Sequence, residues 1–514
     1  MMMKTGLCVA FAALVCGAAL AGKTDMRGLT AVYVDKDAPK AEQEAAANLA
    51  RCLGRITGTG ITVNPRERPY SPSATNAVFL GKRPALESGL LKQADLDGLV
   101  WDGFAIGFGG GRVAVAGNRD TSVNNGVVEL LRRVGCLFTF STYSQGITHA
   151  KPTLVFEDGV TAHNPAFEYR GGWPFWFFRT TPGLRGNPRQ ALDPEIFAKS
   201  TVDGTHTANY LVPKQLYREQ HPEYYAMNLA GKRELYSEAD AYTHLCLSNP
   251  DVRRIAAERV AAWVKMQPES VYFGVSQGDG HDWCQCPGCL AHDAAPGNYS
   301  DRMLKLLVNP VARAVARVRP DAKIVMLAYC GTDEPPVRER PEPNVYIMYC
   351  PYWGIALSMA HPLTDPLNAE ALRQFEGWRA VAPDNMMIYD YNIYFTPSWE
   401  AWAEKVKWFH RQGVRTGAVM CGVPTHFRSL FLHLNEAVQW NPELDVRREQ
   451  QRFLRAAYGA AAPHLEDYFS VVRKQLAKGY AIGVHGASWT GYFGDGAIGR
   501  MLDALDRAVA AAGD

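Results

Sequence analysis

The sequence lacks any excess of charge of one sign and, beyond its N-terminal segment, any long apolar run. Its 54 lysines and arginines are balanced by 52 aspartates and glutamates. Binding to nucleic acid or to an anionic membrane depends on clustered positive charge, so we expect neither as a partner. No stretch after the N-terminal segment reaches the roughly 18 uninterrupted apolar residues of a membrane-spanning helix. The sequence therefore predicts no membrane span.

The N-terminus has the pattern of a targeting signal. Lys4 precedes an apolar run over Leu7–Leu20, which ends in a small-residue Ala-Leu-Ala triplet. This pattern predicts a secretory signal peptide over residues 1–21, cleaved before Gly22. We therefore expect an exported protein, periplasmic or extracellular. A lipoprotein attached through Cys16 is the alternative, which the bulky residues before that cysteine disfavour.

The 514 residues exceed one ordinary core and favour two or three domains. Residues 22–160 alternate strand-like and helix-like runs, which predicts a small α/β domain. The strand-like runs are Thr30–Val34, Ala77–Leu80 and Arg112–Ala116, and the helix-like runs are Ala41–Ile56 and Ser122–Val134. The segment His163-Asn164-Pro165 has the composition of a linker.

Residues 166–440 contain eight strand-like runs that alternate with helical ones, which predicts a (β/α)8 TIM-type barrel. The runs are Glu168–Gly171, Thr207–Leu211, His244–Leu247, Val271–Val275, Lys323–Ala328, Asn344–Cys350, Met386–Tyr389 and Thr416–Cys421. A doubly wound open sheet is the alternative, but no Gly-rich dinucleotide fingerprint follows any run. The pattern of residues 441–514 predicts a C-terminal helical region. Because strands and helices alternate through most of the chain, the predicted fold class is α/β.

Barrel enzymes carry their reactive groups just past the C-terminal ends of the strands. The fourth run leads to Asp279 between two glycines, and the seventh leads to Asp390 between two tyrosines. Glycoside hydrolysis uses a carboxylic acid at the leaving oxygen and a second group at the anomeric carbon. We therefore predict Asp279 and Asp390 as the catalytic pair. The alternatives are a turn carboxylate for Asp279 and an ion pair with a base such as Arg170 for Asp390.

Sugar rings stack on aromatic faces, and the chain has 12 tryptophans and 23 tyrosines. Polar or aromatic residues near the predicted barrel mouth are candidates for substrate binding, although core packing is the commoner role of any one aromatic. The candidates are Arg170, His206, Tyr329, Trp353, Tyr391 and Trp399. The predicted partner is an oligosaccharide or glycan, and its hydrolysis requires no cofactor.

Three cysteines follow the Asp279 loop in a C-x-C-x-x-C arrangement, and a fourth ends the third run. These are Cys284, Cys286, Cys289 and Cys246. Four thiolates from adjacent loops would satisfy a tetrahedral structural zinc site. In an exported protein, disulfides among the same residues are the competing interpretation.

Several motifs follow one another along the chain: Cys246-Leu247-Ser248-Asn249-Pro250, Val275-Ser276-Gln277-Gly278-Asp279-Gly280 with the cysteines that follow, and Trp440-Asn441-Pro442-Glu443-Leu444. This ordered series resembles the family known as domain of unknown function 4838. The region before them resembles the small α/β domain that precedes the barrel of β-hexosaminidases and α-glucuronidases.

The resemblance implies a barrel related to glycoside hydrolase family 163, whose members are endo-β-N-acetylglucosaminidases acting on complex N-glycans. Asp279 and Asp390 match the family pattern. The chain departs from it after the sixth and eighth strands, where Tyr349-Cys350-Pro351-Tyr352 and Met420-Cys421-Gly422-Val423 stand in place of acidic residues. From the resemblance we expect a retaining β-N-acetylglucosaminidase-like activity. The missing acidic residues make a non-catalytic glycan-binding protein the alternative.

Overall fold

The structure is a computed structural model. It describes residues 22–66, 74–137, 147–148, 152–173, 206–235, 237, 239–268, 270–351, 361–390, 399–414, 416–421, 427–478, 493–494 and 496–513. The predicted signal peptide, residues 1–21, lies outside these ranges.

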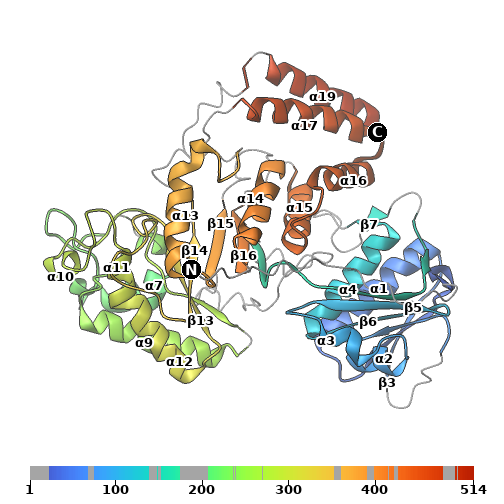
Figure 1. Cartoon of the computed structure of the whole chain (residues 1–514), viewed down its shortest axis with the longest axis horizontal. Coiled ribbons are helices and arrows are strands. Elements are labelled where there is room, and N and C mark those ends of the chain that lie inside the picture. The colour runs from blue at the N-terminus through green and yellow to red at the C-terminus, as the bar shows by residue number, and fades with distance from the viewer. Residues whose placement is uncertain are drawn as a thin grey trace, which may run out of the picture.

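The N-terminal region is a mixed six-stranded sheet with helices on both faces (Figure 1). The strand order is β10 (Gly159–His163), β5 (Phe104–Gly109), β6 (Arg112–Gly117), β4 (Ala77–Leu80), β2 (Ala31–Asp35) and β3 (Thr62–Arg66). β3, β2, β4 and β6 are parallel, and β5 and β10 are antiparallel additions at the edge. Short strands pair separately, β1 (Lys23–Asp25) with β9 (Val155–Glu157) and β7 (Cys136–Leu137) with β8 (Ile147–Thr148).

Alternation along the central strands explains this layering, because successive side chains point to opposite faces. Val78 and Leu80 of β4 pack in the cluster formed with α1 (Lys40–Thr57) and α4 (Asp120–Val134). Ala77 and Phe79 pack on the other face, with α2 (Lys82–Glu87) and α3 (Gln93–Asp97). The expected strands and helices of this region form, with boundaries shifted by one or two residues.

The second sheet contains six parallel strands among the described residues. Their order is β11 (Tyr169–Trp173), β16 (Thr416–Cys421), β15 (Met386–Asp390), β14 (Val345–Tyr349), β13 (Lys323–Ala328) and β12 (Tyr272–Gly274). The longer helices between or after these strands include α9 (Pro250–Met266), α12 (Asn309–Val318), α13 (Ala369–Val381), α14 (Trp399–Arg411) and α15 (Arg428–Trp440). The first strand of this region thus pairs with its last strand, although the described strands alone do not close into a ring.

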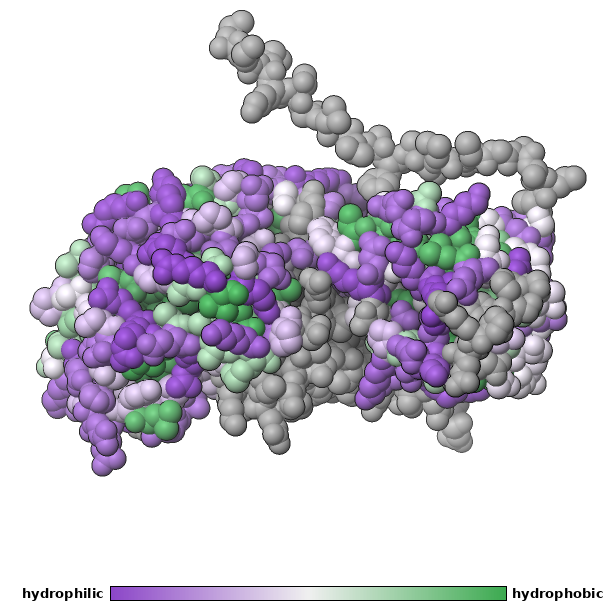
Figure 2. Space-filling model, turned by 90° about the horizontal axis from the view of Figure 1, so that it is seen from below, coloured by the Kyte–Doolittle hydropathy of each residue, from purple (hydrophilic) through white to green (hydrophobic). Residues whose placement is uncertain are grey.

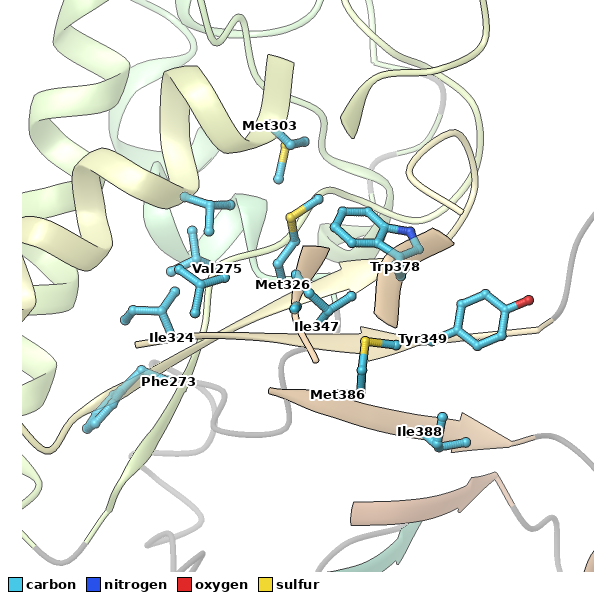
Figure 3. Packing of buried hydrophobic residues seen from close by; sticks show 14 of the residues in the cluster. Phe273, Val275, Met303, Ile324, Met326, Ile347, Tyr349, Trp378, Met386 and Ile388 are labelled. Carbon is cyan, nitrogen blue, oxygen red and sulfur yellow. The ribbon is translucent and has the colours of Figure 1, made fainter. Parts of the chain in front are cut away.

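The strands of this sheet are buried on both faces. Ile324, Met326 and Ile347 point toward the helices, where Trp378 of α13 joins the same cluster (Figure 3). Val325 and Leu327 point to the opposite face, into a separate buried cluster. Burial on both faces explains why these strands read as nearly continuous apolar runs in the sequence.

Two of the eight predicted strands are wrong. Thr207–Leu211 contains a helical turn, α7 (Ala208–Leu211), because Ala208, Leu211 and Val212 are buried at the spacing of a helix. His244–Leu247 forms only an isolated bridge, between Leu245 and Tyr225. Its backbone bonds go to the preceding chain segment, since Cys246 N donates to Tyr224 O at 2.8 Å.

The chain continues in three helices, α16 (Val446–Tyr458), α17 (Ala462–Leu476) and α19 (Ala497–Ala512). α17 and α19 lie side by side at the top of Figure 1. All three lie within residues 441–514, where the sequence predicted a helical region. The face shown in Figure 2 is largely hydrophilic with small apolar patches. Within the described residues, no helix is both long and apolar enough to cross a membrane.

A buried polar joint connects the two sheets. Arg170 Nη1 donates to Asp102 Oδ1 at 3.0 Å and to the Phe167 carbonyl at 2.8 Å. The guanidinium carbon of Arg170 lies 4.9 Å from the centroid of the Trp440 ring. Asn125 Nδ2 donates to the second oxygen of Asp102 at 3.0 Å. The Arg170 and Asp102 side chains are each 1% exposed, so both charges depend on this pairing.

Candidate functional site

The candidate site is built on the loop after β12, over Val275–Gly280. Gly278 must be glycine because a Cβ there would lie 2.3 Å from the Thr243 carbonyl oxygen. Gly280 has a φ of +84°, a conformation that other residues rarely adopt. Asp279 N donates to Ala241 O at 2.6 Å. The two glycines therefore let the loop pack closely on the chain before it while it presents Asp279.

The Asp279 carboxylate is held by one of its two oxygens. Oδ1 accepts from the Tyr329 hydroxyl at 3.1 Å and from Gly280 N at 2.9 Å. Within the described part of the chain, Oδ2 has no hydrogen-bond donor. The side chain is 29% exposed. One oxygen is thus oriented by the protein, while the other is available to a bound molecule.

His206 is the third member of this group. Its Nε2 lies 3.8 Å from Asp279 Oδ1, and its ring meets that of Tyr329 edge to face with centroids 5.7 Å apart. The residue has a φ of +48°, an unusual conformation for a side chain of this size. Burial lowers the pKa of His206, although the nearby Asp279 carboxylate acts in the opposite direction. The structure therefore brings together Asp279, His206 and Tyr329, three residues predicted separately from the sequence.

Two further polar residues support the loop and were not singled out in the sequence. Gln277 Nε2 donates to Tyr329 O at 2.6 Å and to Thr332 Oγ1 at 2.9 Å. His244 Nε2 donates to Asp279 O at 3.0 Å. Burial lowers the pKa of His244 to about 4, so its ring is neutral near pH 7. The sequence could have indicated Gln277 through its place two residues after the predicted strand Val271–Val275, whereas no neighbouring residue distinguished His244.

The other predicted residues have different outcomes. Asp390 is the last residue of β15, which places its backbone at the C-terminal end of the sheet, but its side chain lies outside the described part. Trp353 and Tyr391 fall entirely outside the described residues. Arg170 belongs to the buried joint with Asp102. Trp399, at the start of α14, is 1% exposed and packs on Phe469, so the expectation that it stacks on a sugar is corrected.

The four cysteines of the predicted cluster meet next to this loop. Cys246, Cys284, Cys286 and Cys289 are buried, and their sulfur atoms all lie within 4.8 Å of one another. The Cys246 and Cys286 sulfurs are 3.6 Å apart. A tetrahedral site with Zn–S bonds of about 2.3 Å requires sulfur atoms roughly 3.8 Å apart. The cluster therefore has the donors and the dimensions to hold a structural metal such as zinc.

The surroundings of the cluster suit thiolates. Met227 N donates to Cys284 Sγ at 3.3 Å, and Ser248 N donates to Cys289 Sγ at 3.4 Å. The guanidinium of Arg233 lies near Cys246, and their interaction raises the pKa of Arg233 although burial acts in the opposite direction. A metal with four thiolates would carry net negative charge, which these amides and the cation would offset.

Comparison with known proteins identifies the family. The model described as domain of unknown function DUF4838 matches residues 150–470. The chain belongs to this family. No curated protein matches it.

Solved structures with a similar fold include glycoside hydrolases. A family GH115 4-O-methyl-α-glucuronidase with specificity for decorated arabinogalactans has a TM-score of 0.54 and 13% identity, covering 94% of this chain and 68% of that enzyme. A β-N-acetylhexosaminidase from Bacteroides fragilis has a TM-score of 0.41 and 13% identity, covering 85% of this chain and 94% of that enzyme. At such identities, the glucuronidase shows that this DUF4838 chain has a fold of the glycosidase kind, and leaves its chemistry to be argued from the site.

Proposed function

We propose that the protein is a glycoside hydrolase with a retaining, β-N-acetylglucosaminidase-like activity on glycans. The observation that carries this proposal is Asp279, which follows a parallel strand with one carboxylate oxygen oriented by Tyr329 and the other unbonded within the described chain. An oriented, partly exposed carboxylate is suited to general acid–base work or to stabilising positive charge. Family membership and the glycosidase-like fold agree with this assignment.

The scaffold in this proposal is a (β/α)8-type barrel. Pairing of β11 with β16 supports it, because a closed barrel requires its first and last strands to be neighbours. In such a barrel Asp390, at the end of β15, would face the same mouth as Asp279. One carboxyl group would protonate the leaving oxygen while the other attacks the anomeric carbon. In a substrate-assisted route, the 2-acetamido oxygen attacks and the second carboxylate stabilises the charge that develops.

Kinetics on aryl glycosides and on a complex N-glycan test the proposal, with product anomers followed by NMR. We expect Asp279→Asn to lower kcat by about 100-fold or more, since it removes acid–base or charge stabilisation. The melting temperature should stay unchanged, because the amide retains the oxygen that accepts from Tyr329. Asp333→Asn is the matched control: Asp333 follows β13 and bonds to Gly331 N at 2.7 Å, not to Asp279. Full activity of Asp279→Asn would refute the assignment.

A glycan-binding protein without catalysis is the second candidate. It is favoured by the non-acidic residues after the predicted strands Asn344–Cys350 and Thr416–Cys421, where the resemblance leads us to expect acidic ones. The same panel separates the two functions. Binding of a glycan without release of any product, by both the parent protein and Asp279→Asn, would support the binding protein.

We also propose that the four-cysteine cluster holds one structural zinc ion. The mutual sulfur distances and the amides that donate to Cys284 and Cys289 support this assignment. The metal would brace the loop that carries Asp279, because that loop runs directly into Cys284. It would contribute folding energy and take no part in the reaction.

Metal analysis and denaturation test the zinc proposal. We expect about one zinc per chain, and Cys286→Ser should release it and lower the free energy of unfolding by a few kcal/mol. Cys350→Ser, a buried thiol outside the cluster, should retain the metal. Thiol titration after unfolding distinguishes zinc from disulfides, which would leave fewer free thiols. Four reactive thiols in a metal-free folded protein would contradict both.

We further propose that the protein is exported and begins near Gly22 after cleavage of residues 1–21. The N-terminal pattern of the sequence supports this. Intact mass of the protein from a native host tests it, and a cytoplasmic product that retains Met1 would contradict it.

A further inference from the structure

Two cysteines outside the four-cysteine cluster lie in the N-terminal region of the chain. Cys52 belongs to α1 and Cys136 begins β7, and both are thiols in the structure. The two residues are 2% and 3% exposed and belong to the same buried cluster, which lies between the sheet and the helices α1 and α4. Neither the proposed glycosidase site nor the proposed zinc site uses them.

The topology of the N-terminal sheet brings these two cysteines to one edge. α1 follows β2 and α4 follows β6, and both strands belong to the parallel part of the sheet. Both helices therefore run from the C-terminal edge of the sheet back to its N-terminal edge, packed against each other (Figure 1). Cys52 lies in the last two turns of α1, and Cys136 follows the last residue of α4 by two positions. Both thiols thus lie where the two helices end.

The two thiols also interact with each other. Interaction with the Cys136 thiol lowers the pKa of Cys52, and the same interaction raises the pKa of Cys136. The guanidinium groups of Arg51 and Arg55 act on the pKa of Cys52 in the same downward direction, although burial opposes them. Cys52 is therefore the thiol that ionises more readily. A thiolate is the species that attacks a disulfide.

A covalent bond between the two sulfurs would tie the end of α1 to β7. It would close a loop of roughly 80 residues, and a loop of that length gives a disulfide a large entropic effect on the unfolded chain. β7 and its partner strand β8 both contact α16. The bond would therefore brace the N-terminal region where it meets the C-terminal helices.

We propose that Cys52 and Cys136 form a disulfide bond in the exported protein, separate from the metal-binding cysteines. During folding, the Cys52 thiolate attacks the disulfide of a thiol–disulfide exchange protein, which forms a mixed disulfide and releases one thiolate of that protein. The Cys136 thiolate then attacks the Cys52 sulfur and releases the second. The two cysteines lose two electrons and two protons, and the donor disulfide becomes a dithiol. The inference goes beyond the proposed glycosidase function and depends on the proposed export for its oxidant.

Peptide mapping of the unreduced protein tests the bond. Of the 11 cysteines, Cys8 and Cys16 lie in the predicted signal peptide, so nine remain. The exported protein is unfolded with a chelator present, alkylated, and digested with trypsin without reductant. We expect seven alkylated cysteines, and the peptides that contain Cys52 and Cys136 should be recovered as one crosslinked species that separates on reduction.

Thermal unfolding measures what the bond contributes. Under oxidising conditions, Cys136→Ala should lower Tm by roughly 5–10 °C, and Cys52→Ala/Cys136→Ala should lower it no further, because both variants lose the same bond. After refolding with a reductant, most of the difference from the parent protein should disappear. Cys350→Ala is the matched control, because Cys350 is also 2% exposed and lies outside both groups of cysteines. Its difference from the parent should not depend on the reductant.

The outcomes separate this proposal from those on export and zinc. Nine alkylated cysteines in the exported protein would overturn the disulfide. If the native host does not export the chain, the reduced and unfolded protein is refolded with glutathione and glutathione disulfide, and absence of the crosslinked species would again overturn it. Crosslinks among the cluster cysteines beside the Cys52–Cys136 crosslink would support this disulfide and end the zinc proposal. If Cys136→Ala does not fold, the peptide map of the parent protein decides.

Discussion

Two clusters of polar residues, the Asp102–Arg170 joint and the Asp279 centre, differ in burial and in how fully their polar atoms are hydrogen-bonded. At the joint, Asp102 accepts from Arg170 and Asn125 through its two oxygens, and both charged side chains are 1% exposed. At the centre, Asp279 is 29% exposed and bonded through one oxygen. His206 Nδ1 and Gln277 Oε1 are buried there without a hydrogen-bond partner among the described residues.

The difference agrees with the proposed position of the functional site at Asp279. Buried polar groups in folded proteins are nearly always paired, so a group left without a partner calls for an explanation. The joint follows the rule and serves architecture. The Asp279 centre departs from it with two unpaired atoms and the unusual backbone of His206. Such departures concentrate at sites where a ligand supplies the missing partner.

Breaking the joint should give the largest change in stability. We expect Arg170→Met to lower the free energy of unfolding by about 3–5 kcal/mol, because it leaves Asp102 buried without its cation. The double variant Arg170→Met/Asp102→Leu should recover most of the loss. Urea denaturation measures both. Arg507→Met is the control, since the Arg507–Asp467 pair is 51% and 60% exposed and should contribute less than about 1 kcal/mol. Equal losses in the two single variants would contradict the contrast.

The same contrast explains what the sequence could predict. Strands buried on both faces, such as Lys323–Ala328, leave continuous apolar runs, and that strand begins and ends where the pattern placed it. The position of Asp279 in a loop after a strand could also be predicted, whereas its catalytic role stays a proposal. The spacing of the cysteines likewise predicted a cluster that the structure brings together.

Residues whose roles depend on distant partners could not be predicted. Arg170 lies near the end of the predicted strand Glu168–Gly171 and was therefore considered a sugar-binding candidate. In the structure it is the second residue of β11, and its partner Asp102 is 68 positions away in the sequence. Thr207–Leu211 alternates like a strand, yet the buried spacing that makes it helical is set by packing. The sequence around Trp399 does not distinguish a tryptophan that packs in the core from one that stacks on a sugar.

A smaller effect should follow from acidification at the Asp279 centre. Burial lowers the pKa of His244 to about 4, against about 6.5 in the unfolded chain. Between these values the unfolded state binds the extra proton, so stability falls as pH decreases below about 6.5. The loss attributable to this one group is about 2 kcal/mol at pH 5.

Unfolding free energies from pH 7 to pH 5 test this, with His244→Gln, which keeps a donor for Asp279 O, as the variant. We expect a flatter pH dependence than in the parent protein. His433→Gln provides a comparison away from Asp279, because burial also lowers the pKa of His433, which contacts Arg132 and Glu449. An unchanged slope in His244→Gln would show that its ring is not held neutral by burial.

The smallest expected effect decides what Tyr329 does. Its hydroxyl donates to Asp279 Oδ1 at 3.1 Å, so it acts on the oriented oxygen of the carboxylate. If it positions Asp279, Tyr329→Phe should lower kcat by about tenfold, the equivalent of one hydrogen bond, and leave KM nearly unchanged. If it binds the sugar, as its place at a strand end first indicated, KM should rise instead. Tyr299→Phe is the control, because the Tyr299 ring packs on Trp283 away from Asp279. Steady-state kinetics therefore separates a positioning residue from a binding one. A rise in KM alone would indicate that Gly280 N, and not the Tyr329 hydroxyl, orients the Asp279 carboxylate.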